Sequence, residues 1–204
     1  MVSLSPIKKQ IKNIRKYLRI SEGGGLLRRY FVMNAFDGVL TMVGVVMGAY
    51  VAGVTDFALV IAIGIATSVA VGVSGLWGAF LTEAAERRGE LKSMEKSLHR
   101  ELKGTEIEEA FRVTTYLTAV VFGLSPFIAA ITLLLPFGAY MAFPTEEATA
   151  QEVYLASFAL AGVVFVLLGI YLGRISRESM VLSALKLLLA GVVCVIIIML
   201  LSGG

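Results

Sequence analysis

The chain has 204 residues, of which 57% are hydrophobic and only 16% are charged, and its mean hydropathy is +0.84. A soluble globular domain is about half apolar and about a quarter charged, so one small core could not bury this excess of apolar residues. The composition therefore predicts an integral membrane protein and excludes a soluble enzyme, a secreted disulfide scaffold and a disordered tail. With one cysteine, Cys194, and one histidine, an internal disulfide and a thiolate or imidazole metal cluster are also excluded.

The first segment of the chain, residues 1–30, predicts a basic amphipathic helix on the cytoplasmic side of the membrane. Ser5 suits the N-cap of this helix and Pro6 its first position. Such a helix lies flat on anionic lipid, either as a plain topology anchor or as a gate. We expect the three glycines at 23–25 to end it. Its apolar face consists of Ile7, Ile11, Ile14 and Leu18.

Five stretches follow that are long and apolar enough to cross a bilayer, which takes about 20 residues each. They are residues 31–54, 57–82, 113–142, 153–173 and 180–202. The predicted fold class is all-α, with transmembrane helices 1–2 in residues 31–82, a cytoplasmic connection in 83–112 and transmembrane helices 3–5 in 113–204.

The positions of Lys and Arg predict the orientation of these spans. Of the 18 basic residues, eight precede the first span, seven lie between the second and third, two between the fourth and fifth, and Lys186 lies inside the fifth. Cytoplasmic loops carry an excess of Lys and Arg, so we expect the N-terminus in the cytoplasm and the C-terminus outside. The net charge of +3 is then a topology signal, and we expect no nucleic-acid partner.

Polar residues inside the first two spans mark a candidate translocation pathway. An ionised carboxylate at membrane depth costs about 2.5–3.5 kcal/mol and usually faces a bundle interior or a water-filled path. At helical spacing, Asn34, Asp37 and Thr41 share one face of the first span, and Ser68 lies on a small-residue face of the second. The alternative is that Asp37 is a structural carboxyl group hydrogen-bonded to a neighbouring helix.

Small residues and prolines predict how the spans pack. Gly44 and Gly48 in the first span and Gly72 in the second can bring helices close together in lipid, within the chain or between copies. Pro126 and Pro136 are expected to kink the third span and to free backbone carbonyls that can line a cavity. In the fifth span, Lys186 either extends to the interface or balances the charge of Asp37.

The connection 83–112 combines the features of a candidate metal-capture site. A helix is expected to continue the second span to residue 103, with acidic and basic side chains on opposite faces. Carboxylates with one thioether suit Fe2+ or Mn2+ better than Cu(I), although a solvated acidic face is the alternative. We expect Gly104 to end this helix, and Thr105 with Glu108 to form a capping box for the next. The candidate metal ligands are Asp37 in the membrane and Glu83, Glu86, Glu90, Met94 and Glu101 on the acidic face, whereas His99 is expected to be a surface residue.

Several short motifs resemble the vacuolar iron transporter family. The Asp37-Gly38 pair, followed by Thr41 and the small-residue run 44–48, resembles the first span of that family. Residues 78–81 (Gly-Ala-Phe-Leu) are similar to the end of its second span, and residues 183–186 with Gly191 to its fifth. The order and spacing of these motifs from residue 26 onward carry the resemblance.

The resemblance implies a homodimer in the lipid bilayer that exports Fe2+, and often Mn2+, from the cytosol in exchange for protons. It places Asp37 on the path and implies metal binding by cytoplasmic Glu and Met side chains, with no tightly bound cofactor and no enzymatic activity. Two features differ: the connection 83–112 is much shorter than in typical members, and Ala79 stands where some members carry Glu. A membrane metal sensor or scaffold is the alternative function, and a prokaryotic cell membrane is the expected location.

Overall fold

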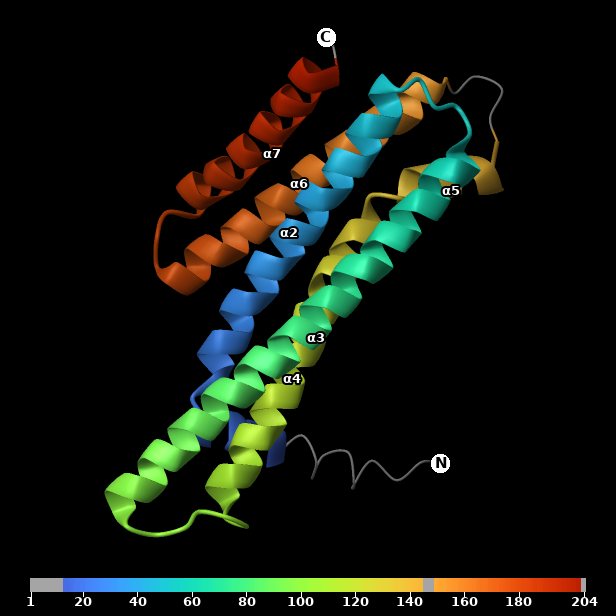
Figure 1. Cartoon of the computed structure of the whole chain (residues 1–204). Helices are drawn as coiled ribbons and strands as arrows, with labels where there is room; N and C mark the ends of the chain where they lie inside the picture. Colours follow the sequence, from blue (N-terminus) through green and yellow to red (C-terminus); the bar gives the residue numbers. More distant parts are fainter. Residues whose placement is uncertain (1–12, 145–148, 203–204) are drawn as a thin grey trace, which may run out of the picture.

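The computed structural model describes residues 13–144 and 149–202, and in these residues all regular structure is helical, with no strand. Figure 1 shows an elongated bundle, in which the short helix α5 (Leu135–Ala142) lies beside the start of the long helix α3. Five helices are long and apolar enough to cross a membrane, which confirms the predicted all-α class with five candidate spans. They are α2 (Gly23–Val51), α3 (Phe57–Leu98), α4 (Glu106–Thr132), α6 (Ala150–Ser176) and α7 (Met180–Ser202).

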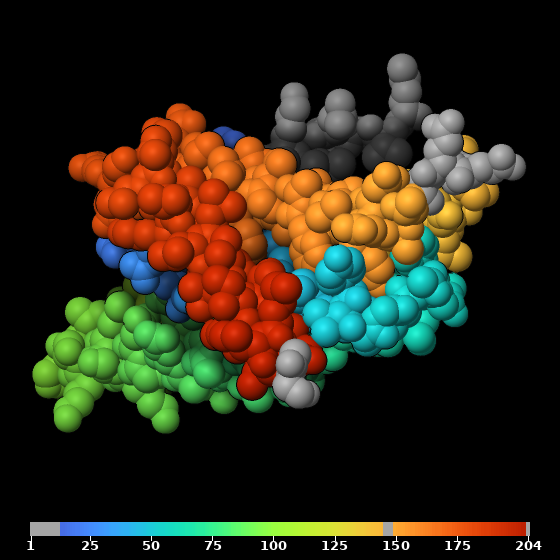
Figure 2. Space-filling model, turned by 90° about the horizontal axis from the view of Figure 1, so that it is seen from above, coloured from blue at the N-terminus to red at the C-terminus, as the bar shows by residue number. Residues whose placement is uncertain are grey.

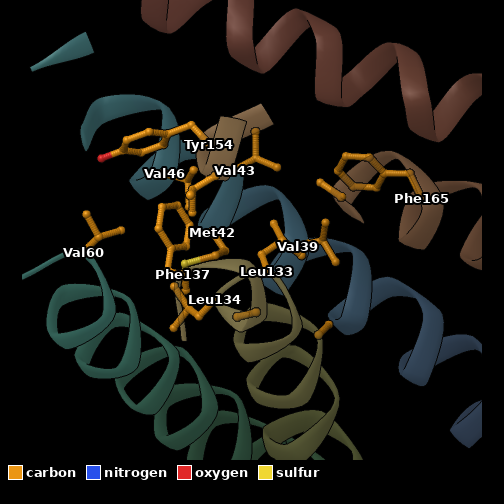
Figure 3. Close-up of a cluster of buried hydrophobic side chains, with 14 of the residues drawn as sticks. Val39, Met42, Val43, Val46, Val60, Leu133, Leu134, Phe137, Tyr154 and Phe165 are labelled. Carbon is orange, nitrogen blue, oxygen red and sulfur yellow. The ribbon is translucent and has the colours of Figure 1, made fainter. Parts of the chain in front are cut away.

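Helix α2 is the centre of the bundle and packs against α3, α4, α6 and α7. Its residues Val39, Met42 and Val46 are fully buried. Figure 3 shows Met42 next to Phe137 of α5 and Leu133 at the end of α4. Since these side chains come from α2, the end of α4 and α5, the hydrophobic core joins the first span to the break between α4 and α5.

Helix α7 is the least enclosed of the five helices. Only 11% of the residues in its most apolar stretch are buried inside the protein, compared with 44% for α2. Figure 2 shows α7 (red) lying along α6 (orange), while the end of α3 (green) projects away from both helices. In a bilayer, the outer surface of α7 would face lipid.

Side-chain caps fix where the helices begin. The Asp56 carboxylate accepts hydrogen bonds from the N–H groups of Ala58 and Leu59 at the start of α3, and Thr149 forms a capping box with Glu152 at the start of α6. At α4, Thr105 accepts from the Glu108 N–H, as predicted, but the Glu108 carboxylate accepts from the Gly104 N–H at 2.6 Å. The expected cap at Thr105 is therefore confirmed, while its reciprocal bond reaches one residue further back.

The predicted third span, residues 113–142, is two helices and not one kinked helix. Pro126 lies inside α4, but Pro136 lies in the first turn of α5, where a missing N–H costs nothing. Between the two helices, the Ser157 hydroxyl of α6 donates to the Leu133 carbonyl at 2.8 Å. The expectation that Pro136 kinks a continuous span was wrong, because the helix ends before that proline.

The helix that continues the second span ends at Leu98, not at residue 103. His99 adopts a left-handed conformation (φ 49°), and the Glu95 carboxylate accepts from the Leu102 N–H at 2.8 Å. Glu101 therefore lies beyond the helix, so the prediction that it shares the acidic face with Glu83 was wrong.

The N-terminal segment is described only from residue 13, where a helix runs to residue 20. Ser5, Pro6, Ile7 and Ile11, and most of the predicted amphipathic helix, lie outside the described residues. The break before the first span falls at Glu22 (φ 53°), and the three glycines 23–25 begin α2 instead of separating the two helices. The Ser21 and Thr114 hydroxyl groups share a hydrogen bond of 2.6 Å, which ties this break to α4.

Candidate functional site

Asp37 lies at the middle residue of α2 and lines a groove of about 410 Å3 between three helices. Asn34, one turn earlier on the same face, lines the groove too, while its amide donates to the Tyr30 carbonyl at 2.8 Å. Two polar side chains of α2 thus meet at one groove, as their spacing predicts. The opposite wall consists of Ala70, Val71, Ser74 and Gly75 of α3 and Pro126 of α4.

The groove lies inside the apolar part of the bundle. Eight residues separate Asp37 from Arg29, which is about 12 Å along a helix. A bilayer has a hydrocarbon core about 30 Å thick, so this carboxyl group lies roughly a third of the way in from the basic end of the bundle. We use the name basic end for the side that holds Arg28, Arg29 and the α3–α4 connection.

Close backbone contacts hold the walls of the groove together. A Cβ atom on Gly38 would lie 2.3 Å from the Pro126 carbonyl oxygen, and one on Gly75 would lie 2.8 Å from the Phe122 carbonyl oxygen. Pro126 has no N–H to donate to that Phe122 carbonyl, which is the usual acceptor four residues earlier. The predicted freeing of backbone carbonyls by Pro126 therefore places an acceptor against Gly75, which lines the groove.

The other two predicted pathway residues lie outside the groove lining. Thr41 is half-buried one turn beyond Asp37, and Ser68 is buried and donates to the Gly64 carbonyl in its own helix at 2.7 Å. The sequence analysis did not identify Ser74 as a pathway residue, because Ser74 lies beside the small-residue face of α3 and not on it. The one feature of the sequence that could have indicated Ser74 is a second hydroxyl group in this span, six residues after Ser68.

One face of α2 is left uncovered between α3 and α7, and we call it the open face. Asp37 and Gly48 are exposed on it, and Thr41 and Gly44 are partly exposed. A Cβ atom on Gly44 would meet only Ile198 of α7, at 3.9 Å, and one on Gly48 would meet nothing within 4 Å. By contrast, the small residues Gly72 and Gly75 of α3 contact α4 within the chain. The open face therefore has room for a further helix.

A second group of charged residues joins α3 to α4 at the basic end, and we call it the Arg87 cluster: Glu83, Arg87, Glu90 and Phe111. Arg87 donates to Glu83 and to Glu90, each at 2.8 Å, and its guanidinium lies 5.1 Å from the Phe111 ring centroid. Burial lowers the pKa of Arg87, but the hydrogen bond and charge of Glu83, with those of Glu90, outweigh burial and raise it overall. The i, i+4 and i, i+3 spacing of these residues was a signal that sequence reasoning did not use.

The structure separates the predicted metal ligands into three places. Asp37 lies in the groove, and Glu83 and Glu90 lie in the Arg87 cluster, where Glu83 is buried and Glu90 is half-buried. Glu86, between these two along α3, and Met94, one turn beyond Glu90, are exposed. In residues 13–144 and 149–202, no group of three or more His, Cys, Asp or Glu side chains is arranged to hold a metal ion. A metal site that used Glu83 and Glu90 would have to draw them away from Arg87.

Two further predictions concern charges outside the groove. Lys186 lies 3.6 Å from the Glu178 carboxylate at the α6–α7 turn. Lys186 therefore forms its ion pair with Glu178 and not with Asp37. His99 is exposed at the end of α3, as expected for a surface residue.

Comparison with known proteins links the chain to an archaeal protein. The chain is 32% identical over 173 residues to the uncharacterized protein MJ0645 of Methanocaldococcus jannaschii, and the match covers 83% of this chain and 85% of that protein. No protein-family model matches the chain, and no solved structure matches it.

Proposed function

The chain belongs to the same family as the archaeal protein MJ0645, and we propose that it transports a divalent metal ion, Fe2+ or Mn2+, out of the cytosol. The observation that carries this proposal is the position of Asp37, which lines a groove at membrane depth together with Asn34. Carboxylate, amide and carbonyl oxygens are hard ligands of the kind that Mn2+ accepts, and Fe2+ is close to it in preference. The resemblance to the vacuolar iron transporter family supports the same cargo.

Proton antiport is the proposed coupling, with Asp37 as the group that exchanges a metal ion for a proton. A carboxyl group within the membrane is costly when ionised and empty, and either a cation or a proton removes that cost. Alternating occupancy by the two cargoes follows from this competition. The positive-inside rule favours a basic end in the cytoplasm, and metal capture at that end would supply the transporter from the cytosol, as export requires.

A homodimer is the proposed assembly, with the second copy covering the open face of α2. Asp37 is exposed in the single chain at a depth where lipid would otherwise surround it, so a second copy would shield this carboxyl group from lipid. Gly44 and Gly48 lie on the same face and present little side-chain volume, which favours close helix association in lipid.

Metal capture is proposed at the acidic side chains of α3, near the Arg87 cluster. Glu86 and Met94 are accessible there, and the incoming cation would replace the Arg87 guanidinium beside Glu83 and Glu90. Arg87 offsets only one of the two carboxylate charges, whereas a divalent cation in its place would offset both.

Flux into metal-free proteoliposomes tests the proposal. We expect the wild-type protein to carry Mn2+ and Fe2+ across the bilayer, and Asp37→Asn to reduce both fluxes to background while the variant remains folded. Asp56→Asn is the matched control, because Asp56 lies outside the groove at the start of α3 and Asn is also a good N-cap.

The control separates loss of transport from loss of a carboxylate in general. Wild-type rates in purified Asp37→Asn protein would refute the assignment of the groove. Absence of flux in the wild type would refute transport and favour a metal sensor or scaffold.

A further inference from the structure

We propose that a pocket between α3 and α4, on the outer side of the Arg87 cluster, binds the phosphate headgroup of an anionic phospholipid. The pocket has a volume of about 260 Å3. Arg88 and Phe80 of α3 line one wall, and Arg112 and Tyr116 of α4 line the other. It lies at the basic end and is distinct from the groove at Asp37.

Three arginines line the pocket, and two of them, Arg88 and Arg112, have no carboxylate partner within residues 13–144 and 149–202. Glu108 also lines the pocket, but its carboxylate is engaged with the Gly104 N–H. Arg87, the third arginine of the lining, differs because Glu83 and Glu90 neutralise it. Two exposed guanidinium groups therefore remain on opposite walls, and each can donate paired hydrogen bonds to phosphate oxygens.

The other end of the pocket is aromatic. Phe80 and Tyr116 stack with ring centroids 5.6 Å apart and planes 30° from parallel. Phe80 precedes Arg88 by eight residues, so this ring pair lies about 12 Å further along α3 toward the apolar part of the bundle. Tyrosine at the edge of an apolar layer is typical of the membrane interface.

This arrangement favours a lipid over a free anion. A phospholipid offers a phosphate for Arg88 and Arg112 and an acyl chain for the rings of Phe80 and Tyr116, whereas inorganic phosphate would use only the arginines. Basic residues near a membrane surface attract anionic lipid by about 1 kcal/mol each. Positions on facing walls would add a defined binding geometry to that general attraction.

Thermal stability of the full chain in detergent, measured against added lipid, tests the proposal. We expect phosphatidylglycerol to raise the melting temperature in a saturable way and phosphatidylcholine to have little effect. Arg88→Gln with Arg112→Gln should require about tenfold more phosphatidylglycerol for the same rise. Lys92→Gln with Lys96→Gln is the matched control, because it removes the same number of positive charges from the basic end without altering the pocket lining.

Two further measurements identify the source of the phosphate and test whether the paired hydrogen bonds of arginine are needed. Inorganic phosphate and glycerol phosphate should not reproduce the effect, and Arg88→Lys with Arg112→Lys should weaken it despite the retained charge. Equal weakening in the control variant, or equal stabilisation by inorganic phosphate, would overturn the proposal. An unchanged phosphatidylglycerol response in the Arg88→Gln, Arg112→Gln variant would also overturn it.

Discussion

Arg87 holds two carboxylates of α3 and an aromatic ring of α4 in one cluster, and the buried member of that cluster is Glu83. Replacing Arg87 with Gln would leave the Glu83 carboxylate in a buried position without its cation. We expect this variant to lose roughly 1–3 kcal/mol of stability, which is the usual cost of an unsatisfied buried polar group. Thermal unfolding in detergent is the measurement.

Glu83→Gln combined with Arg87→Gln is the control for that loss. The double variant removes the charge together with its partner, so it should recover much of the stability that the single variant loses. Equal losses in the single and double variants would mean that the charge of Glu83 is not what Arg87 stabilises.

Metal binding at the same cluster should stabilise the protein against heat. Mn2+ or Co2+ should raise the melting temperature by mass action, and Mg2+ should do so less, because it releases its water reluctantly. Glu86→Gln with Glu90→Gln should remove most of this rise, whereas His99→Ala should leave it intact. Arg87→Gln should increase the metal-induced rise, since it removes the competing cation. If metal raised the melting temperature of the Glu86→Gln, Glu90→Gln variant as much as that of the wild type, metal capture at this face of α3 would be excluded.

The residues of the groove illustrate what can be predicted from one sequence. Asn34 and Asp37 could be identified because a polar group at membrane depth is costly wherever the neighbouring helices lie. Ser74 and the Phe122 carbonyl, whose usual donor is missing at Pro126, could not be assigned to the groove. Helical periodicity tells which residues share a face but not which helix that face meets. Arg87 was missed for another reason: its spacing to Glu83 was visible, but the acidic residues were grouped by face without their basic neighbours.

At the scale of elements, the contact between α2 and α4 is the closest one at the groove. Gly38→Ala would place a Cβ atom 2.3 Å from the backbone of Pro126, which cannot move without shifting α4. We expect a loss of about 1–3 kcal/mol, as for other overpacked contacts, together with reduced metal flux. Gly48→Ala on the same helix meets nothing within 4 Å and should be neutral or slightly stabilising. Similar melting temperatures for the two variants would contradict the observed approach of α2 to α4.

The sequence predicts the first or last residue of a helix well where an apolar stretch begins or ends at a polar residue. It predicts these residues poorly where the apolar or polar character continues past the end of the helix. The start of α3 after Asp56 and the start of α7 at Met180 agree with the sequence expectation, because a polar cap precedes one apolar run and a charged turn the other. The end of α3 was placed five residues too late, since Gly104 is a common helix terminator and His99 is not. The α4–α5 break was missed because Leu133 and Leu134 are as apolar as the helices around them.

At the scale of the whole molecule, the open face of α2 makes a prediction about assembly. Gly48→Leu would fill the space that a second copy is proposed to occupy, so it should weaken the dimer while leaving the monomer folded. Gly162→Leu on α6 is the control, because Gly162 also meets nothing within 4 Å but lies away from the open face. Oligomer mass in detergent and crosslinking in membranes measure the effect. A dimer that survives Gly48→Leu but not Gly162→Leu would place the interface on α6.

The five candidate spans of residues 13–144 and 149–202 have a further consequence for the symmetry of the proposed transport. An odd number of crossings cannot be divided into two equal inverted halves of whole helices, the arrangement that lets many transporters exchange inward-facing and outward-facing states. Because the basic side chains gather at one end, all copies should insert in the same direction, and a two-fold axis relating two of them would run along the membrane normal. Exposure of the groove to one side and then the other would then require a change of shape within each copy or a rotation of the two copies about that axis.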